Sequence, residues 1–367
     1  MGALVFLRAG ARCTLAALTP LEDASIIVRT LAPGGALAKL QLSMVLSNND
    51  RTRPLLSGAI QPDGIDLVTT SVHPSEMFWR QLSFQEFDVS EMSVSSFLIH
   101  VSRGNPDWVG LPVFTSRTFF HTNVLIRTDR GINSPGDLNG KRMGVPEYQQ
   151  TAALWARGVL QHEFDVDPAS IEWHMERTEA LSHGGATGFQ PPAGVKLLRI
   201  PQEKNIGSML ASGELDATLL YLPENNLVDR SKEDFTNSTI VRRLFPDAQA
   251  EGARYYAKTG FFHINHCVVV RRTLVEQQPW VVLNLFHAFV KAKDSVNERA
   301  KELADVYFKL GLLPNEGRKA LAVDPYPYGV VANRGVLETI TQYSHEQGLT
   351  PRVLALNEVF AANTLDL

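Results

Sequence analysis

Leu40-Gln-Leu-Ser-Met-Val-Leu46 alternates apolar and polar side chains, and this alternation predicts a β-strand. The following sequence changes its pattern several times, and it predicts a short helix over 51–56, a strand over 65–68, a helix over 74–82 and a strand over 87–89. Strands that alternate with helices are typical of a parallel sheet covered by helices. The fold class predicted from this stretch is therefore α/β.

A second series of strands and helices begins at Lys141-Arg-Met-Gly-Val145, and β-rich joins lie near 119–127 and 259–267. These joins indicate that the chain leaves one lobe, builds a second and returns, after which the sequence is mainly helical. We therefore predict that residues 39–122 and 262–367 form lobe 1 and that residues 123–261 form lobe 2. A ligand cleft is expected between the lobes, because open α/β sheets bind ligands at the carboxyl ends of their strands.

Composition excludes several classes of protein. The 367 residues carry a formal net charge of −4, which excludes a strongly basic nucleic-acid binder. The two cysteines cannot form a disulfide framework or a cysteine-rich metal site, and no apolar run is long enough for a transmembrane helix. Residues 1–38 read as a leader outside the core; a secretory signal is the alternative, although Arg8 and Arg12 interrupt its apolar stretch.

No nucleotide-binding glycine motif, nucleophile elbow or His-Glu-x-x-His zinc pair is present. The candidates for function are therefore polar residues at the ends of strands. Arg51 and Arg53 follow the first strand, where two guanidinium groups at a helix start could hold a carboxylate. The alternative is a solvated helix end. Glu91 follows the third strand together with Ser93 and Ser95, and this group could orient phenolic hydroxyls or act as an acid or base. The alternative is that Glu91 only caps a helix.

The remaining candidates lie further along the chain. Arg117 and His121 are four residues apart, so on an extended segment they share a face; a structural role for His121 is the alternative. His263-x-x-His266 has strand spacing that puts its two rings on opposite faces, which disfavours a metal pair and leaves His266 as a proton donor. Other histidines, His183 among them, read as surface or capping residues. Two further segments could contact a ligand: the start of a helix predicted over 149–164 and the proline-rich turn at 324–329. Their candidate residues are Tyr148, Gln149, Thr151 and Tyr328.

Several of these segments together resemble one family. Asp50-Arg-Thr-Arg-Pro-Leu-Leu56, Phe87-Asp-Val-Ser-Glu-Met-Ser93, Gly144-Val-Pro-Glu-Tyr-Gln149 and Pro327-Tyr-Gly329 are similar to 4,5-dihydroxyphthalate decarboxylases, and the likeness runs from about Leu40 to Phe360. The resemblance implies a two-lobed, type II periplasmic-binding-protein-like fold with crossing hinge strands. It also implies a cytoplasmic enzyme that acts on a small aromatic carboxylate without an organic cofactor. The segment 175–189 departs from the family pattern and leaves the substrate open.

The implied reaction converts 4,5-dihydroxyphthalate to protocatechuate and CO2. In this hypothesis Arg51, Arg53 and Arg117 hold carboxylates, Glu91 orients or deprotonates a hydroxyl, and His121 or His266 protonates the ring. No metal ligand set is expected, although a divalent metal stays possible, and so does a homodimer; neither nucleic acid nor membrane is expected as a partner. The main alternative is a solute-binding protein for an aromatic or other organic anion, which would be periplasmic if the leader is a signal peptide.

Overall fold

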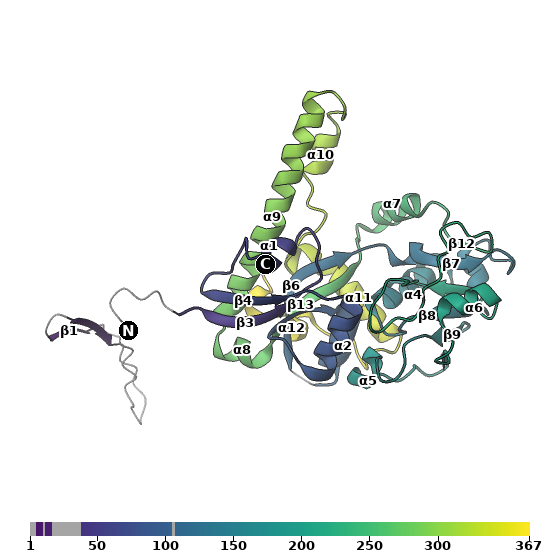
Figure 1. Ribbon diagram of the computed structural model, residues 1–367, viewed down its shortest axis with the longest axis horizontal. Coiled ribbons are helices and arrows are strands. Elements are labelled where there is room, and N and C mark those ends of the chain that lie inside the picture. Colours follow the sequence, from purple (N-terminus) through teal and green to yellow (C-terminus); the bar gives the residue numbers. More distant parts are fainter. Residues whose placement is uncertain (1–4, 10–11, 17–37, 105–106) are drawn as a thin grey trace. The chain divides into compact units, whose positions relative to one another are not determined.

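The computed structural model describes residues 5–9, 12–16, 38–104 and 107–367, and it divides the chain into two compact units, 1–40 and 41–367. In the first unit, β1 (Val5–Ala9) pairs antiparallel with β2 (Arg12–Ala16). The rest of the predicted leader, up to residue 37, lies outside the described residues. The remainder of this section concerns the second unit (Figure 1).

The first large sheet has five strands in the order β4-β3-β5-β13-β6. Its strands are β3 (Leu40–Val45), β4 (Ile65–Thr70), β5 (Val89–Ser93), β6 (Trp108–Arg117) and β13 (Ile264–Arg271). β3 runs parallel to β5, as the alternation of strands and helices predicts, whereas β13 returns from far along the chain and is antiparallel to both neighbours. All five residues of β5 are buried, because the strand lies between β3 and β13 at the centre of the sheet.

The second large sheet has six strands in the order β10-β9-β8-β11-β7-β12. Its strands are β7 (Val124–Arg127), β8 (Arg142–Val145), β9 (Glu172–Met175), β10 (Lys196–Arg199), β11 (Ala217–Leu219) and β12 (Val241–Arg243). The four strands β8 to β11 are parallel, and β7 and β12 are antiparallel additions at one side. The β-rich join that we expected near 119–127 lies at the passage between the two sheets, since β6 ends at Arg117 and β7 begins at Val124.

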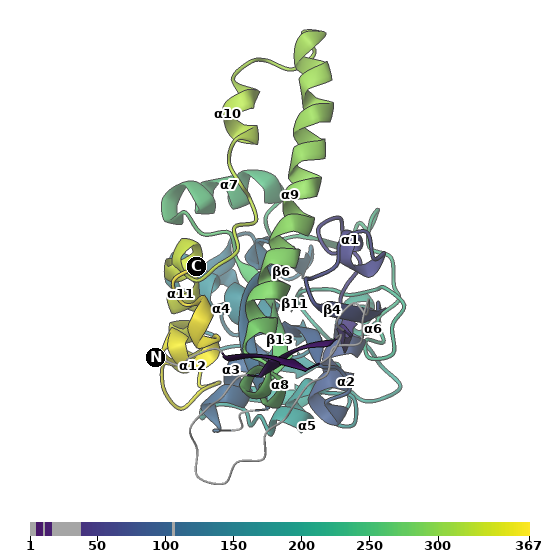
Figure 2. The same ribbon diagram turned by 90° about the vertical axis from the view of Figure 1, so that its left-hand side faces the viewer.

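Helices connect and cover the strands. Their bounds are α1 (Arg53–Leu56), α2 (Pro74–Phe84), α3 (Val94–Ser102), α4 (Thr151–Phe164), α5 (His183–Thr187), α6 (Ile206–Ser212), α7 (Ala248–Thr259), α8 (Arg272–Gln277), α9 (Trp280–Lys309), α10 (Gly317–Leu321), α11 (Arg334–Glu346) and α12 (Leu356–Val359). Short 3-10 turns lie at Phe120–Asn123, Pro135–Leu138, Val331–Asn333 and Ala362–Thr364. α9 packs on β6 and then extends away from the sheets, with α10 beside its far end (Figures 1 and 2).

Two short segments cross between the sheets. The first joins β6 to β7 through the turn at Phe120–Asn123, and the second leads from α7 into β13 through residues 260–263. They run close together, since the Thr118 N–H donates a 3.2 Å hydrogen bond to the His263 carbonyl. The chain thus leaves the first sheet for the second and later returns to the first, and the crossings themselves are turns and irregular backbone between strands.

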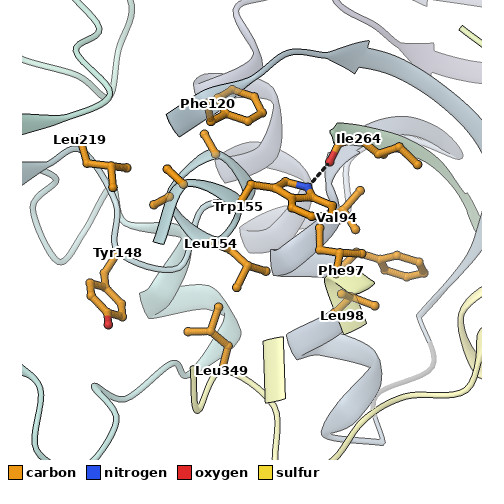
Figure 3. Packing of buried hydrophobic residues seen from close by; sticks show 14 of the residues in the cluster. Val94, Phe97, Leu98, Phe120, Tyr148, Leu154, Trp155, Leu219, Ile264 and Leu349 are labelled. Carbon is orange, nitrogen blue, oxygen red and sulfur yellow. Dashed lines mark hydrogen bonds between the residues drawn. The ribbon is translucent and has the colours of Figure 1, made fainter. Parts of the chain in front are cut away.

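Helix α4, which follows β8 of the second sheet, contacts the first sheet directly. Trp155 of α4 is fully buried, and its indole N–H donates a 2.9 Å hydrogen bond to the carbonyl of Ile264 in β13 (Figure 3). On the same helix, a Cβ at Gly158 would stand 2.2 Å from the ring of Tyr343, so only glycine allows α11 to lie this close to α4. In the part of the chain that is described, no helix is both long and apolar enough to cross a membrane.

Candidate functional site

A cavity of about 170 Å³ lies between elements of the two sheets, and we call it the inter-sheet cavity. The first sheet supplies the start of α2, the end of β5 and the start of β13; the second supplies the start of α4 and the segments after β9 and β11. The side chains around it are His73, Pro74, Ser75, Phe78, Ser93, Phe120, Gln150, Thr151, Ala152, Arg177, His183, Leu220, Leu222, Asn265 and His266. It is smaller than the about 300–1,000 Å³ of typical pockets for drug-sized ligands, and so suits a single substituted ring.

His266 and Glu91 form a hydrogen-bonded pair at this cavity. His266 Nδ1 lies 2.6 Å from Glu91 Oε1, and Asn265 Nδ2 donates a 2.8 Å hydrogen bond to His266 Nε2. These partners place the proton of the neutral ring on Nδ1. Glu91 is fully buried, and its second oxygen accepts hydrogen bonds from the Ser47 N–H (2.9 Å) and hydroxyl (2.6 Å). Glu91 therefore acts on a ligand only through His266.

The environment keeps Glu91 charged. Burial by itself would raise its pKa, but the hydrogen bonds and charge of His266 and the hydrogen bonds from Ser47 outweigh it and lower that pKa. A carboxylate behind one imidazole nitrogen orients the ring and stabilises its protonated form, while the other nitrogen faces the ligand. The pair can thus supply or accept a proton at Nε2 once a ligand displaces the Asn265 amide.

Hydroxyl groups lie at the start of α4. Thr151 Oγ1 accepts a 2.9 Å hydrogen bond from the Ser95 N–H and lies 2.8 Å from Ser93 Oγ. The Ser95 hydroxyl donates to the Gln149 carbonyl at 2.5 Å. Ser93 and Thr151 line the cavity, whereas Ser95 and Gln149 lie behind them and hold α3 against α4. The structure therefore brings together these four predicted residues with Glu91 and His266.

Arg177 is the charged residue of this cavity that sequence reasoning missed. It is 2% exposed and forms a buried ion pair with Asp229, with Nε 2.8 Å from Oδ1, and its NH2 donates to Ser75 Oγ at 2.7 Å. Its NH1 group has only long contacts, at 3.3 and 3.5 Å to the nitrogens of His183 and 4.0 Å to Glu147. The NH1 group thus lacks a short hydrogen bond, whereas the rest of the guanidinium is held by Asp229 and Ser75.

His183 is not the surface or capping histidine that we predicted. It lies at the start of α5, is 2% exposed, and its Nε2 donates a 3.0 Å hydrogen bond to the Ser75 carbonyl. Burial, and then the neighbouring Arg177 charge, lower its pKa to about 3, so the ring is neutral. The prediction failed because the segment 182–194 reads as a glycine-rich loop, whereas α5 folds it against α2 and α3.

All three predicted arginines lie outside the inter-sheet cavity, and two of them follow the first strand. The Arg51 guanidinium stacks 3.7 Å above the Tyr326 ring and donates a 2.9 Å hydrogen bond to the Thr115 carbonyl. Arg53 points to solvent, where its half-exposed side chain pairs with Asp50 at 2.9 Å. The alternative of a solvated helix end therefore describes the position of Arg53.

His121 and Tyr148 belong to the core. His121 is fully buried among Phe119, Phe245, Tyr255 and His263, and its Nε2 lies 3.1 Å from Glu251. Its neighbour Phe120 points to the cavity instead, because the 3-10 turn directs the two rings apart. Tyr148 stacks 3.8 Å from the Arg157 guanidinium and packs against Trp173.

His263 and His266 do lie in different surroundings, as the strand spacing predicts. His263 stacks on Trp155 with 4.4 Å between ring centres, on the far side from the pair formed by His266 and Glu91. In the described residues no group of three His, Cys, Asp or Glu side chains is arranged to hold a metal ion.

Arg117 lies beside a different and larger space, whereas Tyr328 is buried and lines neither cavity. The Arg117 guanidinium donates to the carbonyls of Phe262 (3.0 Å) and Pro327 (2.9 Å) and to Asn333 Oδ1 (2.5 Å). Burial lowers the pKa of Arg117 to about 10, and burial also raises the pKa of the Tyr328 hydroxyl. Arg117 lines a cavity of about 570 Å³ beside the crossing segments, which we call the hinge cavity. It holds no acid–base pair, so we place the candidate active site at the smaller cavity.

Acidification should unfold this protein through its buried histidines. Burial lowers the pKa of His183, His121 and His263, so the unfolded chain binds more protons than the folded one below its ordinary histidine pKa of about 6.5. The contribution of these neutral histidines to the free energy of unfolding is therefore fully present above about pH 6.5 and is lost as the pH falls. We expect the free energy of unfolding in urea to be about 2 kcal/mol lower at pH 5.5 than at pH 7.5, roughly 1 kcal/mol each for His183 and His263, and His121 acts in the same direction.

The matched control is His263→Phe, which keeps a ring on Trp155 and removes one titrating group. It should reduce the difference in the free energy of unfolding between the two pH values by roughly 1 kcal/mol. Equal free energies of unfolding at pH 5.5 and pH 7.5 in the wild-type protein would contradict this prediction.

Comparison with known proteins adds two kinds of similarity. No family model matches the chain. The chain is 34% identical over 333 residues to a 4,5-dihydroxyphthalate decarboxylase of Comamonas testosteroni, covering 90% of this chain and 99% of that protein. It is 39% identical over 181 residues to a 4,5-dihydroxyphthalate decarboxylase of Pseudomonas putida, covering 49% of this chain and 70% of that protein.

Solved structures confirm the predicted fold. The periplasmic aliphatic sulphonate binding protein SsuA of Escherichia coli aligns with a TM-score of 0.51 at 13% identity, covering 89% of this chain and 92% of that one. The alkanesulfonate-binding protein SsuA of Xanthomonas axonopodis pv. citri aligns with a TM-score of 0.50 at 14% identity, covering 90% of this chain and 100% of that one. At such identities the likeness shows a periplasmic-binding-protein fold and nothing about the ligand.

Proposed function

The chain belongs to the 4,5-dihydroxyphthalate decarboxylase family, and from this we propose that it is a carboxy-lyase that converts 4,5-dihydroxyphthalate to protocatechuate and CO2. The observation that carries the proposal is the pair of His266 and Glu91 at the inter-sheet cavity, because the reaction needs a proton donor beside an anion site. A solute-binding protein would use the same fold, but the full-length similarity is to decarboxylases.

The cavity suits a small, multiply charged anion. Arg177 lines the cavity, and α2, α3 and α4 all begin at it, with 11, 9 and 14 residues respectively. The first N–H groups of each helix have no partner within the helix, and the helix dipole makes its N-terminus favourable for negative charge. Three such ends and one guanidinium support binding of the two substrate carboxylates.

The chemistry follows from the positions of the substituents. Each carboxylate of 4,5-dihydroxyphthalate has a hydroxyl para to it, which donates electron density to the carbon that carries the carboxylate. In the proposed step, His266 Nε2 gives its proton to that carbon and a dearomatised intermediate forms. The carbon–carbon bond to the carboxylate then breaks, its electron pair returns to the ring, and CO2 leaves. His266 recovers a proton from solvent, so the reaction consumes one proton for each CO2 released.

The other cavity residues take supporting roles in this proposal. Glu91 orients His266 and stabilises its charged form. The hydroxyl groups of Ser93 and Thr151 are placed to hydrogen-bond a phenolic hydroxyl of the ring. Arg51, Arg53, Arg117 and His121, which we had considered for direct contact with substrate, have no part in this mechanism because they lie outside the cavity.

Product analysis tests the proposal. Purified protein is incubated with 4,5-dihydroxyphthalate, with and without a chelator, and protocatechuate and CO2 are followed by chromatography and mass spectrometry. Equal amounts of the two products are expected. If there is no conversion but the diacid raises the melting temperature, the cavity binds aromatic diacids without turnover, and the solute-binding alternative replaces this proposal.

A further inference from the structure

We propose that the hinge cavity is a second ligand site, which takes a small aromatic monocarboxylate with its carboxylate toward Arg117. This site is separate from the inter-sheet cavity, and the inference does not depend on the proposed reaction. At about 570 Å³ the hinge cavity falls within the usual range for small-molecule pockets.

The charge of Arg117 is the first argument. Its side chain is only 8% exposed, and its hydrogen bonds go to two backbone carbonyls and one amide oxygen, all of them neutral. Within residues 38–104 and 107–367, no carboxylate oxygen lies within 4.0 Å of its guanidinium nitrogens, and its Nε has no hydrogen-bond partner. Buried charges in proteins are normally paired, so this cation lacks a counterion.

The nearest acidic side chain on the cavity wall is already neutralised. Asp324 forms an ion pair with Lys293 of α9 and acts on Arg117 only at longer range, so the Arg117 guanidinium has no carboxylate in contact. The first turn of α11 also lines the cavity, through Asn333, Gly335 and Val336, and its helix dipole adds to the attraction for an anion. Two independent features therefore favour a negative group at this end of the cavity.

The rest of the wall fits a ring. Phe119, Phe261, Phe262 and Tyr256 present aromatic surface, and the exposed area of the lining is mainly apolar. Aromatic walls with one cation match a ring that carries a single carboxylate better than they match a sugar or an inorganic ion. Phe119 and Phe262 belong to the two crossing segments, so a ligand here touches both connections between the sheets.

Benzoate is the probe, since it lacks a hydroxyl para to its carboxylate and cannot be decarboxylated by the route above. Its binding is measured by isothermal titration calorimetry with the wild-type chain, with Ala253→Trp and with Ala257→Trp. Ala253 is exposed on α7 and lines the hinge cavity, whereas Ala257 is exposed on the same helix and does not line it. We expect Ala253→Trp to bind one benzoate fewer per chain than the wild type, and Ala257→Trp to bind as many as the wild type.

A second experiment removes the charge of Arg117 instead of filling the cavity. Arg117→Gln should weaken benzoate binding at this site at least tenfold and leave the binding of neutral benzamide within about twofold, a difference of at least 1.4 kcal/mol for the anion. The proposal is overturned if the wild type binds no benzoate or if Ala253→Trp binds as much as Ala257→Trp. Should Arg117→Gln fail to fold, the two α7 variants still decide the question.

Discussion

Replacement of His266 by Gln is expected to lower the turnover of 4,5-dihydroxyphthalate by about 10²–10⁴-fold, because the group that gives a proton to the ring is lost. The Gln amide can still donate a hydrogen bond to Glu91, so the fold should persist. The measurement is protocatechuate formation per folded chain, with folding checked by circular dichroism. His174→Gln is the matched control, because His174 lies on β9, pairs with Glu172 and does not line the cavity.

Two further variants separate direct from indirect roles. Glu91→Gln should lower turnover less than His266→Gln and should move the alkaline limb of the pH–rate profile to lower pH, since Glu91 acts only by stabilising the charged form of His266, which is the form that gives the proton. His121→Gln should leave turnover per folded chain near that of the wild type. Loss of turnover in His121→Gln together with normal turnover in His266→Gln would reverse our assignment of the proton donor.

Much of the fold could be predicted because local signals agree with tertiary structure. The helix at 206–212 shows such signals, because the Asn205 side chain caps its start and a left-handed Gly213 follows its end. α3 was missed because Val94 to His100 are all buried, so its sequence shows no amphipathic period. α7 was also missed, although Asp247 caps its start and Gly260 ends it, which are signals that a single sequence does contain.

The candidate site could be predicted only in part. Glu91, Ser93 and Thr151 follow strands or begin helices, and the ends of parallel strands meet at one edge of a sheet, so their positions carry information. Arg177 carries no such signal: it lies in an irregular segment, and only its pairing with Asp229, 52 residues further on, places it in the cavity. For the remaining residues, the direction of the side chain decides whether it reaches the inter-sheet cavity, and the sequence does not show that direction. Arg51 and Arg117 lie near the ends of strands of the first sheet, but Arg51 turns toward Tyr326 and Arg117 toward the hinge cavity.

The buried ion pair of Arg177 and Asp229 should dominate the stability of the cavity wall. Asp229 is 3% exposed, and the Arg177 charge and hydrogen bonds outweigh burial and lower its pKa. Arg177→Met leaves a buried carboxylate without its cation, and Asp229→Leu leaves a buried guanidinium without its carboxylate. Each single variant is expected to lower the free energy of unfolding in urea by about 3–5 kcal/mol.

The double variant Arg177→Met, Asp229→Leu then separates stability from ligand binding. It contains no unpaired charge from this pair, so its loss of stability should be clearly smaller than the sum of the two single losses, and it can approach the wild type. Because the anion-binding guanidinium is gone, this stable variant should still fail to bind the aromatic diacid, as measured by the absence of a rise in melting temperature. A double variant that is stable and binds the diacid as the wild type does would show that Arg177 only supports the fold, and the carboxylates would then have to be held by the three helix ends alone.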